Sequence, residues 1–223
     1  MESTSTSRGF TILELLVVLG IITVITAVAI TSQSSFNKSL VLSNTAYDLA
    51  LSIRSAQTFG IGSRLTTPGV GGVSNAGYGI YIKKNGLQST PITTYTIFAD
   101  ISPACAGGSL PNCKPGNGIY DGSDPIIQTF TLGNGVKISD FCVYDGSPHC
   151  AWSSGSSASS VDIVFTRPNA DPVIKSDATG GNSEQKAYIT LMSTQGTTRY
   201  VCVTSMGVIM PTATTPTASA NCP

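Results

Sequence analysis

The feature that most constrains this chain is an apolar run from Phe10 to Ile30. The run holds 21 residues, and Glu14 is the one charged residue in it. A helix rises about 1.5 Å per residue, so a run of this length matches the ~30 Å hydrocarbon core of a bilayer. We therefore expect residues 10–30 to form a membrane-spanning helix.

The charges that flank the run predict its orientation. Arg8 precedes it, and the next basic residue is Lys38. Basic residues collect on the cytoplasmic side of a span. The N-terminus is therefore expected in the cytoplasm, and the rest of the chain outside the membrane.

After the span, the pattern changes to that of an amphipathic helix. Apolar or small residues recur at steps of three or four: Leu42, Ala46, Leu49, Ile53, Ala56 and Gly60. The first proline is Pro68, and Gly60 and Gly62 supply a stop signal. One long helix is therefore expected, with a spanning half at 10–30 and an amphipathic half at 31–60.

The remainder is rich in strand-forming residues separated by Gly- and Ser-rich loops. The expected strands are residues 78–82, 93–99, 126–132, 136–144, 161–166, 186–192 and 198–204. Residues 61–210 should form an extracytoplasmic β-sheet domain, followed by a low-complexity tail at 211–223. The fold class is α+β: a long N-terminal helix packed on an antiparallel β-sheet.

The cysteines are even in number and have no C-x-x-C spacing, which favours disulfides over a metal site. They are Cys105, Cys113, Cys142, Cys150, Cys202 and Cys222. The simplest pairing joins neighbours, 105–113, 142–150 and 202–222, although six cysteines allow 15 connectivities. Unpaired buried thiols in a cytosolic protein are the alternative.

The charge balance argues against strong electrostatic partners. Twelve Lys and Arg residues offset twelve Asp and Glu residues, and only 11% of the chain is charged. Binding of nucleic acid or anionic lipid is therefore not predicted from net charge.

The segment RGFTILELLVV at 8–18 resembles the prepilin signature of type IV pilins and type II secretion pseudopilins, apart from an exchange of Ile and Leu inside the run. The resemblance implies that residues 1–9 are a leader peptide. A prepilin peptidase would cut between Gly9 and Phe10 and methylate the new Phe10 amine. It also implies a location in a bacterial inner membrane before assembly, with other pilin or pseudopilin subunits as partners.

The energetics of a buried charge also point to a role for Glu14. A carboxylate inside a membrane helix is costly and usually has a partner, yet the span contains no Lys or Arg. Cleavage would place a free ammonium on Phe10, about one helical turn away. The resemblance implies that Glu14 pairs with the N-terminal amine of a neighbouring subunit during filament assembly. A carboxylate that snorkels to the interface is the alternative.

A secretory signal peptide cut after Ala27-Val28-Ala29 is a second interpretation of the same region. The apolar run is longer than the usual ~7–15 residues and contains an acid, so this interpretation is disfavoured. An N-terminus at Phe10 rather than Ile30 would distinguish the two.

The rest of the chain resembles the H-type minor pseudopilins of type II secretion and the FimT-like minor pilins. The similar segments are residues 49–64, 117–132 and 198–209. This resemblance implies a structural subunit of a pilus or pseudopilus, neither an enzyme nor a holder of a cofactor. A major pilin, and a DNA-binding or adhesive tip pilin, are the alternatives.

Three further groups of residues allow other functions. Asp100, Asp121 and Asp124 could bind calcium, although an Asx-turn before a strand is favoured because no EF-hand spacing is present. DNA binding would need clustered cations, and the basic residues of the C-terminal half are scattered: Arg167, Lys175, Lys186 and Arg199. His149 beside Cys150 could suggest a nucleophile pair, but adjacent strand residues point apart.

Overall fold

A computed structural model describes residues 9–62, 76–86, 90–101, 116–152, 157–179 and 182–214, without the side chains at positions 31, 32, 34 and 35. The chain forms two compact units, and the boundary between them lies between Leu40 and Val41. Three of the six cysteines, at positions 105, 113 and 222, lie outside the described residues. Most of the predicted tail lies outside them as well.

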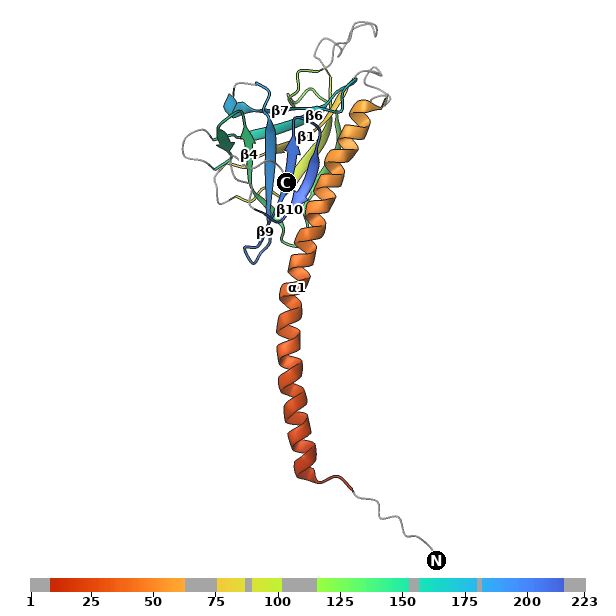
Figure 1. Ribbon diagram of the computed structural model, residues 1–223, viewed down its shortest axis with the longest axis vertical. Coiled ribbons are helices and arrows are strands. Elements are labelled where there is room, and N and C mark those ends of the chain that lie inside the picture. Colours follow the sequence, from red (N-terminus) through yellow and green to blue (C-terminus); the bar gives the residue numbers. More distant parts are fainter. Residues whose placement is uncertain are drawn as a thin grey trace, which may run out of the picture. The chain divides into compact units, whose positions relative to one another are not determined.

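The N-terminal element is one helix, α1 (Ile12–Ile61), of 50 residues (Figure 1). Its segment Ile12–Ile30 has a mean hydropathy of 2.7 and no buried residue, so by length and composition it can cross a membrane. Hydroxyls in this segment bond to the preceding turn: Thr23 Oγ1 donates to the Gly20 carbonyl at 2.8 Å, and Thr26 Oγ1 to the Ile22 carbonyl at 2.7 Å. These polar groups need no partner outside the helix.

Beyond Val41, one side of α1 is part of the hydrophobic core. The buried helix positions include Leu42, Ala46, Leu49, Ile53 and Ala56, which are the positions that the amphipathic pattern predicts. Apolar side chains at i, i+4 and i+7 share one face, so this stripe packs against the sheets. The helix–sheet packing of an α+β fold is therefore confirmed.

Within the described residues, ten strands form two antiparallel sheets, where the sequence led us to expect one. The first sheet has the order β3-β2-β1-β6-β7, and the second has the order β10-β9-β8-β4-β5. The first comprises β1 (Gly77–Lys83), β2 (Thr94–Asp100), β3 (Ile126–Thr131), β6 (Ser160–Phe165) and β7 (Pro172–Ser176). The second comprises β4 (Lys137–Tyr144), β5 (Pro148–Cys150), β8 (Lys186–Met192), β9 (Thr198–Thr204) and β10 (Ile209–Thr212).

The core joins both sheets to the helix. Ile80 of β1, Ile163 of β6, Phe141 of β4 and Ile189 of β8 belong to the same buried cluster as the helix stripe. A single core of this kind ties all layers into one unit, because each sheet is apolar on the face that it turns inward. A short 3-10 helix, Asp177–Thr179, follows β7.

Gly60, in the last turn of α1, lies against the main chain of β6. A Cβ at this position would overlap the Phe165 carbonyl oxygen and lie 2.8 Å from the Phe165 carbonyl carbon. Because a strand main chain cannot rotate aside, we expect Gly60→Ala to destabilise the fold by about 2 kcal/mol. The measurement is denaturant unfolding of the detergent-solubilised chain, followed by the fluorescence of Trp152, its single tryptophan.

The matched control for this change is Gly133→Ala. A Cβ at Gly133 meets no atom within 4 Å, so its effect should stay within about 0.5 kcal/mol. Equal unfolding midpoints for the two variants would show that the close approach at Gly60 does not constrain the fold.

Candidate functional site

The start of α1 is fixed by Thr11. Its Oγ1 accepts the Glu14 N–H at 3.2 Å, and its carbonyl accepts the Leu15 N–H at 3.2 Å. Thr11 is therefore the N-cap and Glu14 is the third residue of the first turn. Thr-x-x-Glu is the capping-box pattern, a local signal that the sequence carries at the start of the apolar run.

The cap places the predicted cleavage point outside the helix. Gly9 and Phe10 precede the first helical residue, Ile12. Phe10 is 82% exposed, and a Cβ at Gly9 would meet no atom within 4 Å. The Gly9–Phe10 peptide bond is therefore accessible and not held by helical hydrogen bonds.

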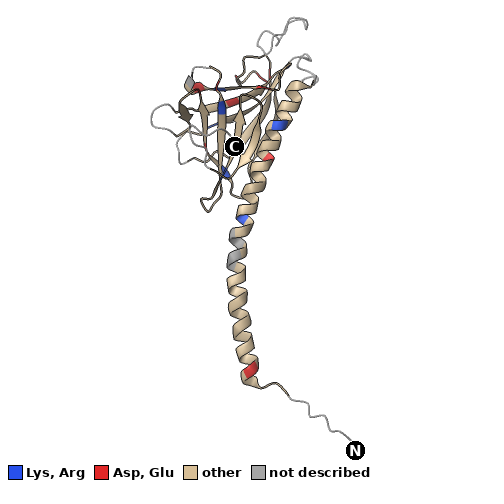
Figure 2. Ribbon diagram, viewed as in Figure 1, with Lys and Arg blue, Asp and Glu red and all other residues tan. Residues whose placement is uncertain are grey.

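Glu14 lies where the helix itself favours a negative charge. It is the acidic residue of the first turn, close to main-chain N–H groups that carry the positive end of the helix dipole. In Figure 2 the apolar half of α1 is tan apart from red at this turn. The span itself supplies no cation to pair with this carboxylate, since Ile12–Ile30 contains no Lys or Arg.

The N-terminal segment matches a known family. Residues 4–30 match the family model described as the prokaryotic N-terminal methylation motif. This N-terminal segment is that of a type IV pilin or pseudopilin. The match covers the predicted cleavage point, Glu14 and the apolar segment of this pilin-like chain. No curated protein and no solved structure matches the chain.

The loop before β3 is held by aspartate carboxylates of the β-sheet domain. Asp100 Oδ2 accepts the Gly118 N–H at 2.8 Å, and Asp124 Oδ1 accepts the Ile101 N–H at 2.9 Å. Asp121 Oδ1 accepts from the Ser123 N–H at 3.0 Å. The last bond is the Asx-turn that the sequence favoured at this place.

Asp162 of β6 belongs to the same group, and the sequence analysis missed it. Its Oδ1 accepts the Tyr120 N–H at 2.9 Å. Nothing near position 162 in the sequence indicates this role, because the contact joins residues 42 positions apart. Burial, reinforced by the charges of Asp100 and Asp124, raises the pKa of Asp162 to about 7. Burial likewise raises the pKa of Asp100 to about 6.

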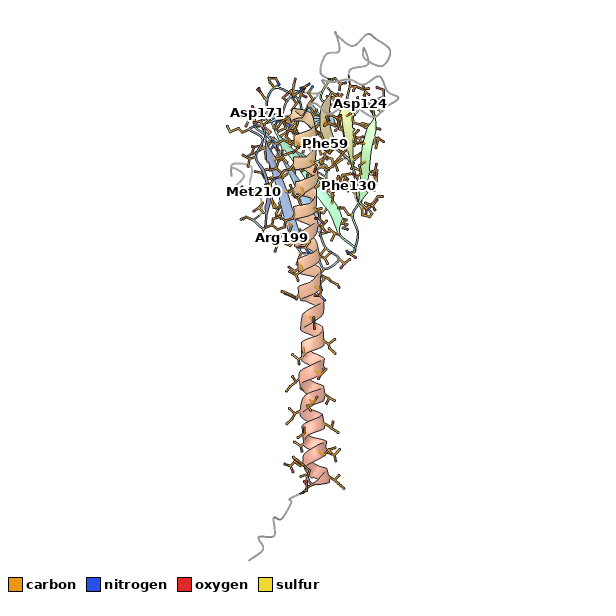
Figure 3. All side chains as sticks on the ribbon, turned by 90° about the vertical axis from the view of Figure 1, so that its right-hand side faces the viewer. Phe59, Asp124, Phe130, Asp171, Arg199 and Met210 are labelled. Carbon is orange, nitrogen blue, oxygen red and sulfur yellow. A yellow bond between two sulfur atoms is a disulfide. The ribbon has the colours of Figure 1, made fainter. Side chains whose placement is uncertain are left out.

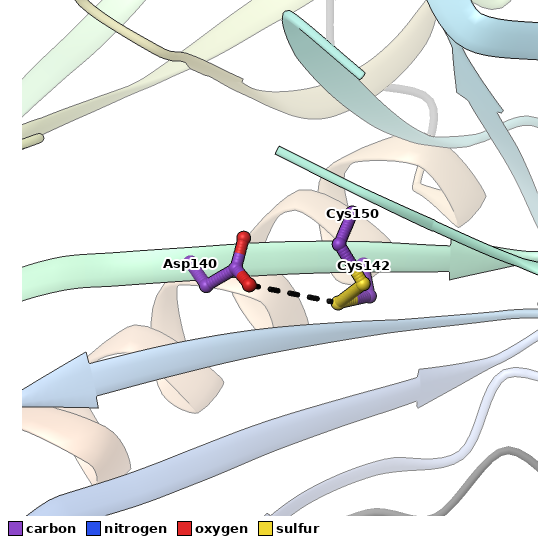
Figure 4. Close-up of side chains that lie close together, drawn as sticks. All are labelled: Asp140, Cys142 and Cys150. Carbon is purple, nitrogen blue, oxygen red and sulfur yellow. Dashed lines mark hydrogen bonds between the residues drawn. A yellow bond between two sulfur atoms is a disulfide. The ribbon is translucent and has the colours of Figure 1, made fainter. Parts of the chain in front are cut away.

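Within the described residues, the three calcium candidates do not bring their ligand atoms within 4.8 Å of one another as a group. Within the described ranges, the one group of three acid, His or Cys ligand atoms lying within 4.8 Å of one another is Asp140, Cys142 and Cys150 (Figure 4). Two of its members are the sulfurs of a disulfide, which offers no thiolate to a metal. Asp100, Asp121 and Asp124 are absent from that group. At least one oxygen of each accepts a main-chain N–H group, while Asp100 Oδ1 has no hydrogen-bond partner among the described residues.

The structure contains the disulfide Cys142–Cys150, which joins β4 to β5. It coincides with one of the neighbour pairings considered above. Cys202 is also disulfide-bonded, and the other half of that bond lies outside the described residues. Because Cys150 is oxidised, it cannot act with His149 as a nucleophile pair. His149 Nε2 instead lies 3.1 Å from Asp145 Oδ1.

The basic residues considered for DNA are not gathered on one surface element. Lys175 lies on β7 of the first sheet and bonds to the Asn117 carbonyl at 2.8 Å. Lys186 and Arg199 lie on the second sheet, where Lys186 pairs with Thr204 and Arg199 with Leu191. Five steps along β8 separate these two pairs, roughly 17 Å at about 3.3 Å per residue.

Proposed function

We propose that this pilin-like protein is a minor pilin or pseudopilin, a structural subunit of a type IV pilus or of a type II secretion pseudopilus. The observation that carries the proposal is the methylation motif over residues 4–30, which includes the apolar helix segment Ile12–Ile30. The protein would be anchored in a bacterial inner membrane, N-terminus inside, before assembly. Its work is mechanical, and it needs no cofactor.

Processing by a prepilin peptidase supplies the chemistry that assembly needs. Cleavage after Gly9 leaves a new ammonium on Phe10, which the same enzyme methylates. The apolar segment is fully exposed, so outside lipid it must pack against other apolar helices. Within such a bundle the buried carboxylate of Glu14 needs a cation, and the ammonium of a neighbouring subunit provides one.

The proposal is tested by the intact mass of the protein isolated from filaments or membranes. The expected mass is that of residues 10–223 plus one methyl group. We expect Gly9→Val to abolish cleavage while the chain still folds, because a side chain at Gly9 meets open space. The effect is therefore on recognition by the peptidase.

Two results would contradict the proposal. A chain that retains Met1 would exclude prepilin processing. A chain that begins at Ile30 would instead identify the apolar run as a secretory signal peptide.

A further inference from the structure

The loop of residues 116–124, named here the Gly118 loop, lies on the face of the first sheet that is turned away from the core. Ile80 of β1 belongs to the core, so its neighbour Tyr81 points to the opposite face. On that face, the centroid of the Tyr120 ring in the loop lies 4.8 Å from that of Tyr81 and 5.3 Å from that of Phe98. Phe98 is fully buried, so the loop shields an apolar ring from water.

Aspartate carboxylates hold the Gly118 loop on this face. Asp100 of β2 accepts the Gly118 N–H at 2.8 Å. Asp162 of β6 accepts the Tyr120 N–H at 2.9 Å, and Asp124, at the end of the loop, accepts the N–H of the residue after β2 at 2.9 Å. Within the described ranges, no main-chain carbonyl of a strand bonds to an N–H of this loop. The attachment of its N–H groups therefore depends on these carboxylates.

The carboxylates are buried close together without a matching cation. Their exposed fractions are 1% for Asp100, 3% for Asp162 and 4% for Asp124. Lys175 lies opposite Asp162 across the β6–β7 pair, but its Nζ donates to the Asn117 carbonyl at 2.8 Å. None of the three carboxylates forms an ion pair with a Lys or Arg of the described part of the chain. A buried charge without a partner is costly, so ionisation of this group opposes the closed arrangement.

Acids outnumber cations around the loop. The groups that face its carboxylates are Asp100 on β2, Asp162 on β6, Asp121, Asp124 and Tyr120 in the loop, Tyr81 on β1, Asp177 in the 3-10 helix, and the cations Lys83 on β1 and Lys175 on β7.

Burial has a larger effect on these carboxylates than the hydrogen bonds that they accept. It raises the pKa of Asp162 to about 7 and the pKa of Asp100 to about 6, and the neighbouring carboxylates act in the same direction. The N–H groups of Tyr120 and Gly118 lower these pKa values, but they do not offset the burial. The closed loop therefore favours the protonated carboxyl groups.

We propose that the Gly118 loop is a pH-sensitive lid on the outer face of the first sheet, which stays closed while Asp100 and Asp162 hold their protons and detaches when they ionise. Detachment would admit water to both carboxyl groups and would uncover the ring of Phe98. In water each pKa would return toward its ordinary value of 3.8. The lid is therefore tightest below about pH 4 and loosens as the pH rises to about 7. The inference does not depend on the proposed function.

The test is hydrogen exchange in the full chain, solubilised in detergent with its disulfides intact during the exchange. Protection of the Gly118 and Tyr120 amides is compared at pH 5 and pH 8, after correction for the intrinsic effect of pH on exchange. Ionisation of Asp162 alone favours the open lid by at most about a hundredfold between these two pH values. We expect the protection of both amides to fall at least about tenfold.

The amides of β8 show whether the opening is local. β8 lies in the middle of the second sheet, so its amides exchange chiefly through global unfolding. At pH 8 we expect them to stay at least about tenfold better protected than the Gly118 and Tyr120 amides. Low concentrations of denaturant should speed the exchange of β8 and leave that of the loop unchanged.

Asp162→Asn removes the charge and keeps an oxygen that can accept the Tyr120 N–H. We expect the ratio of Tyr120 protection at pH 5 to that at pH 8 to drop at least about threefold in this variant. Asp171→Asn, at an exposed position, is the matched control and should keep the ratio within about twofold. Figure 3 shows Asp171 and Asp124 on opposite sides of α1. The comparison of pH values in the unmodified chain stands even if Asp162→Asn does not fold.

Three outcomes would overturn the proposal. The first is equal protection of the loop amides at pH 5 and pH 8. The second is equal protection of the loop and β8 amides at pH 8, which would mean that the loop leaves the sheet only when the whole domain unfolds. The third is an unchanged ratio in the folded Asp162→Asn variant.

Discussion

Glu14→Gln is expected to leave cleavage after Gly9 intact and to lower incorporation into filaments at least tenfold. The carboxylate would be the sole charge that this helix presents to the Phe10 ammonium of its neighbour. Glutamine keeps the length of the side chain and one acceptor oxygen but not its charge. Without the charge, the neighbouring ammonium would be left unpaired among apolar side chains, which costs far more than a lost surface contact.

The measurement compares the amount of mature subunit in purified filaments with the amount left in the membrane. Thr11→Val is the matched control, because it removes the hydroxyl that caps the helix at 3.2 Å and leaves the charge of Glu14. A lost cap costs about 1 kcal/mol, so we expect near-normal incorporation. Normal incorporation of Glu14→Gln, or failure of both variants alike, would refute the charge-pairing account.

Asp162→Asn is expected to stabilise the fold at pH 8 and to flatten its dependence on pH. Burial raises the pKa of Asp162 from its ordinary value of 3.8 to about 7. The folded chain therefore holds this proton more tightly than the unfolded chain does. The resulting stability is fully present below about pH 4 and is lost as the pH rises to about 7.

The neighbouring carboxylates of Asp162 reinforce this effect. The charges of Asp100, Asp124 and Asp177 all raise the pKa of its carboxyl group, while Lys175 lies opposite Asp162 across the β6–β7 pair. The pKa of Asp162 thus differs by about three between the unfolded and the folded chain. This difference corresponds to a loss of folding free energy of at most about 4 kcal/mol at pH 8. Asparagine avoids this cost because it has no charge to bury, and its amide oxygen can still accept the Tyr120 N–H.

Thermal unfolding of the solubilised chain at pH 5 and pH 8 checks this prediction. The original chain should be more stable at pH 5, and Asp162→Asn should narrow the difference. Asp100 retains a smaller dependence of the same sign, because burial raises the pKa of its carboxyl group to about 6. Asp171→Asn, at an exposed position, should leave the pH dependence unchanged. A chain that becomes more stable as the pH rises would contradict the assignment.

Much of the fold was predictable because its signals are local. The helix expected over 10–60 is observed as Ile12–Ile61, and the strand expected at 186–192 is β8 with the same bounds. The spacing of apolar residues along the sequence predicts both the helix and the strand. For the helix ends, the Thr11 cap and the Gly60 approach to β6 add a physical reason.

The short edge strands were not predicted. No strand was expected at Pro148–Cys150, which form β5, and β10 extends two residues, Pro211 and Thr212, into the segment assigned to the tail. Proline and short length argue against a strand in a sequence, yet both are normal at a sheet edge. Only the partner strands, β4 and β9, define these elements. The division into two sheets has the same origin, because long-range pairing leaves no local signal.

The candidate site divides in the same way. The N-terminal motif lies within one continuous segment and could therefore be recognised in the sequence. The set of aspartates around the Gly118 loop could be predicted only in part. Asp162 belongs to this set but lies on β6, 42 positions from its partner Tyr120.

The threonine hydroxyls of the apolar segment have a consequence for how a subunit could leave the membrane. Thr23 and Thr26 already bond to carbonyls of their own helix. Exchanging lipid tails for neighbouring helices would therefore neither break nor form a hydrogen bond at these positions. Extraction and reinsertion would then differ in free energy chiefly through packing and through one ionic contact near the helix start.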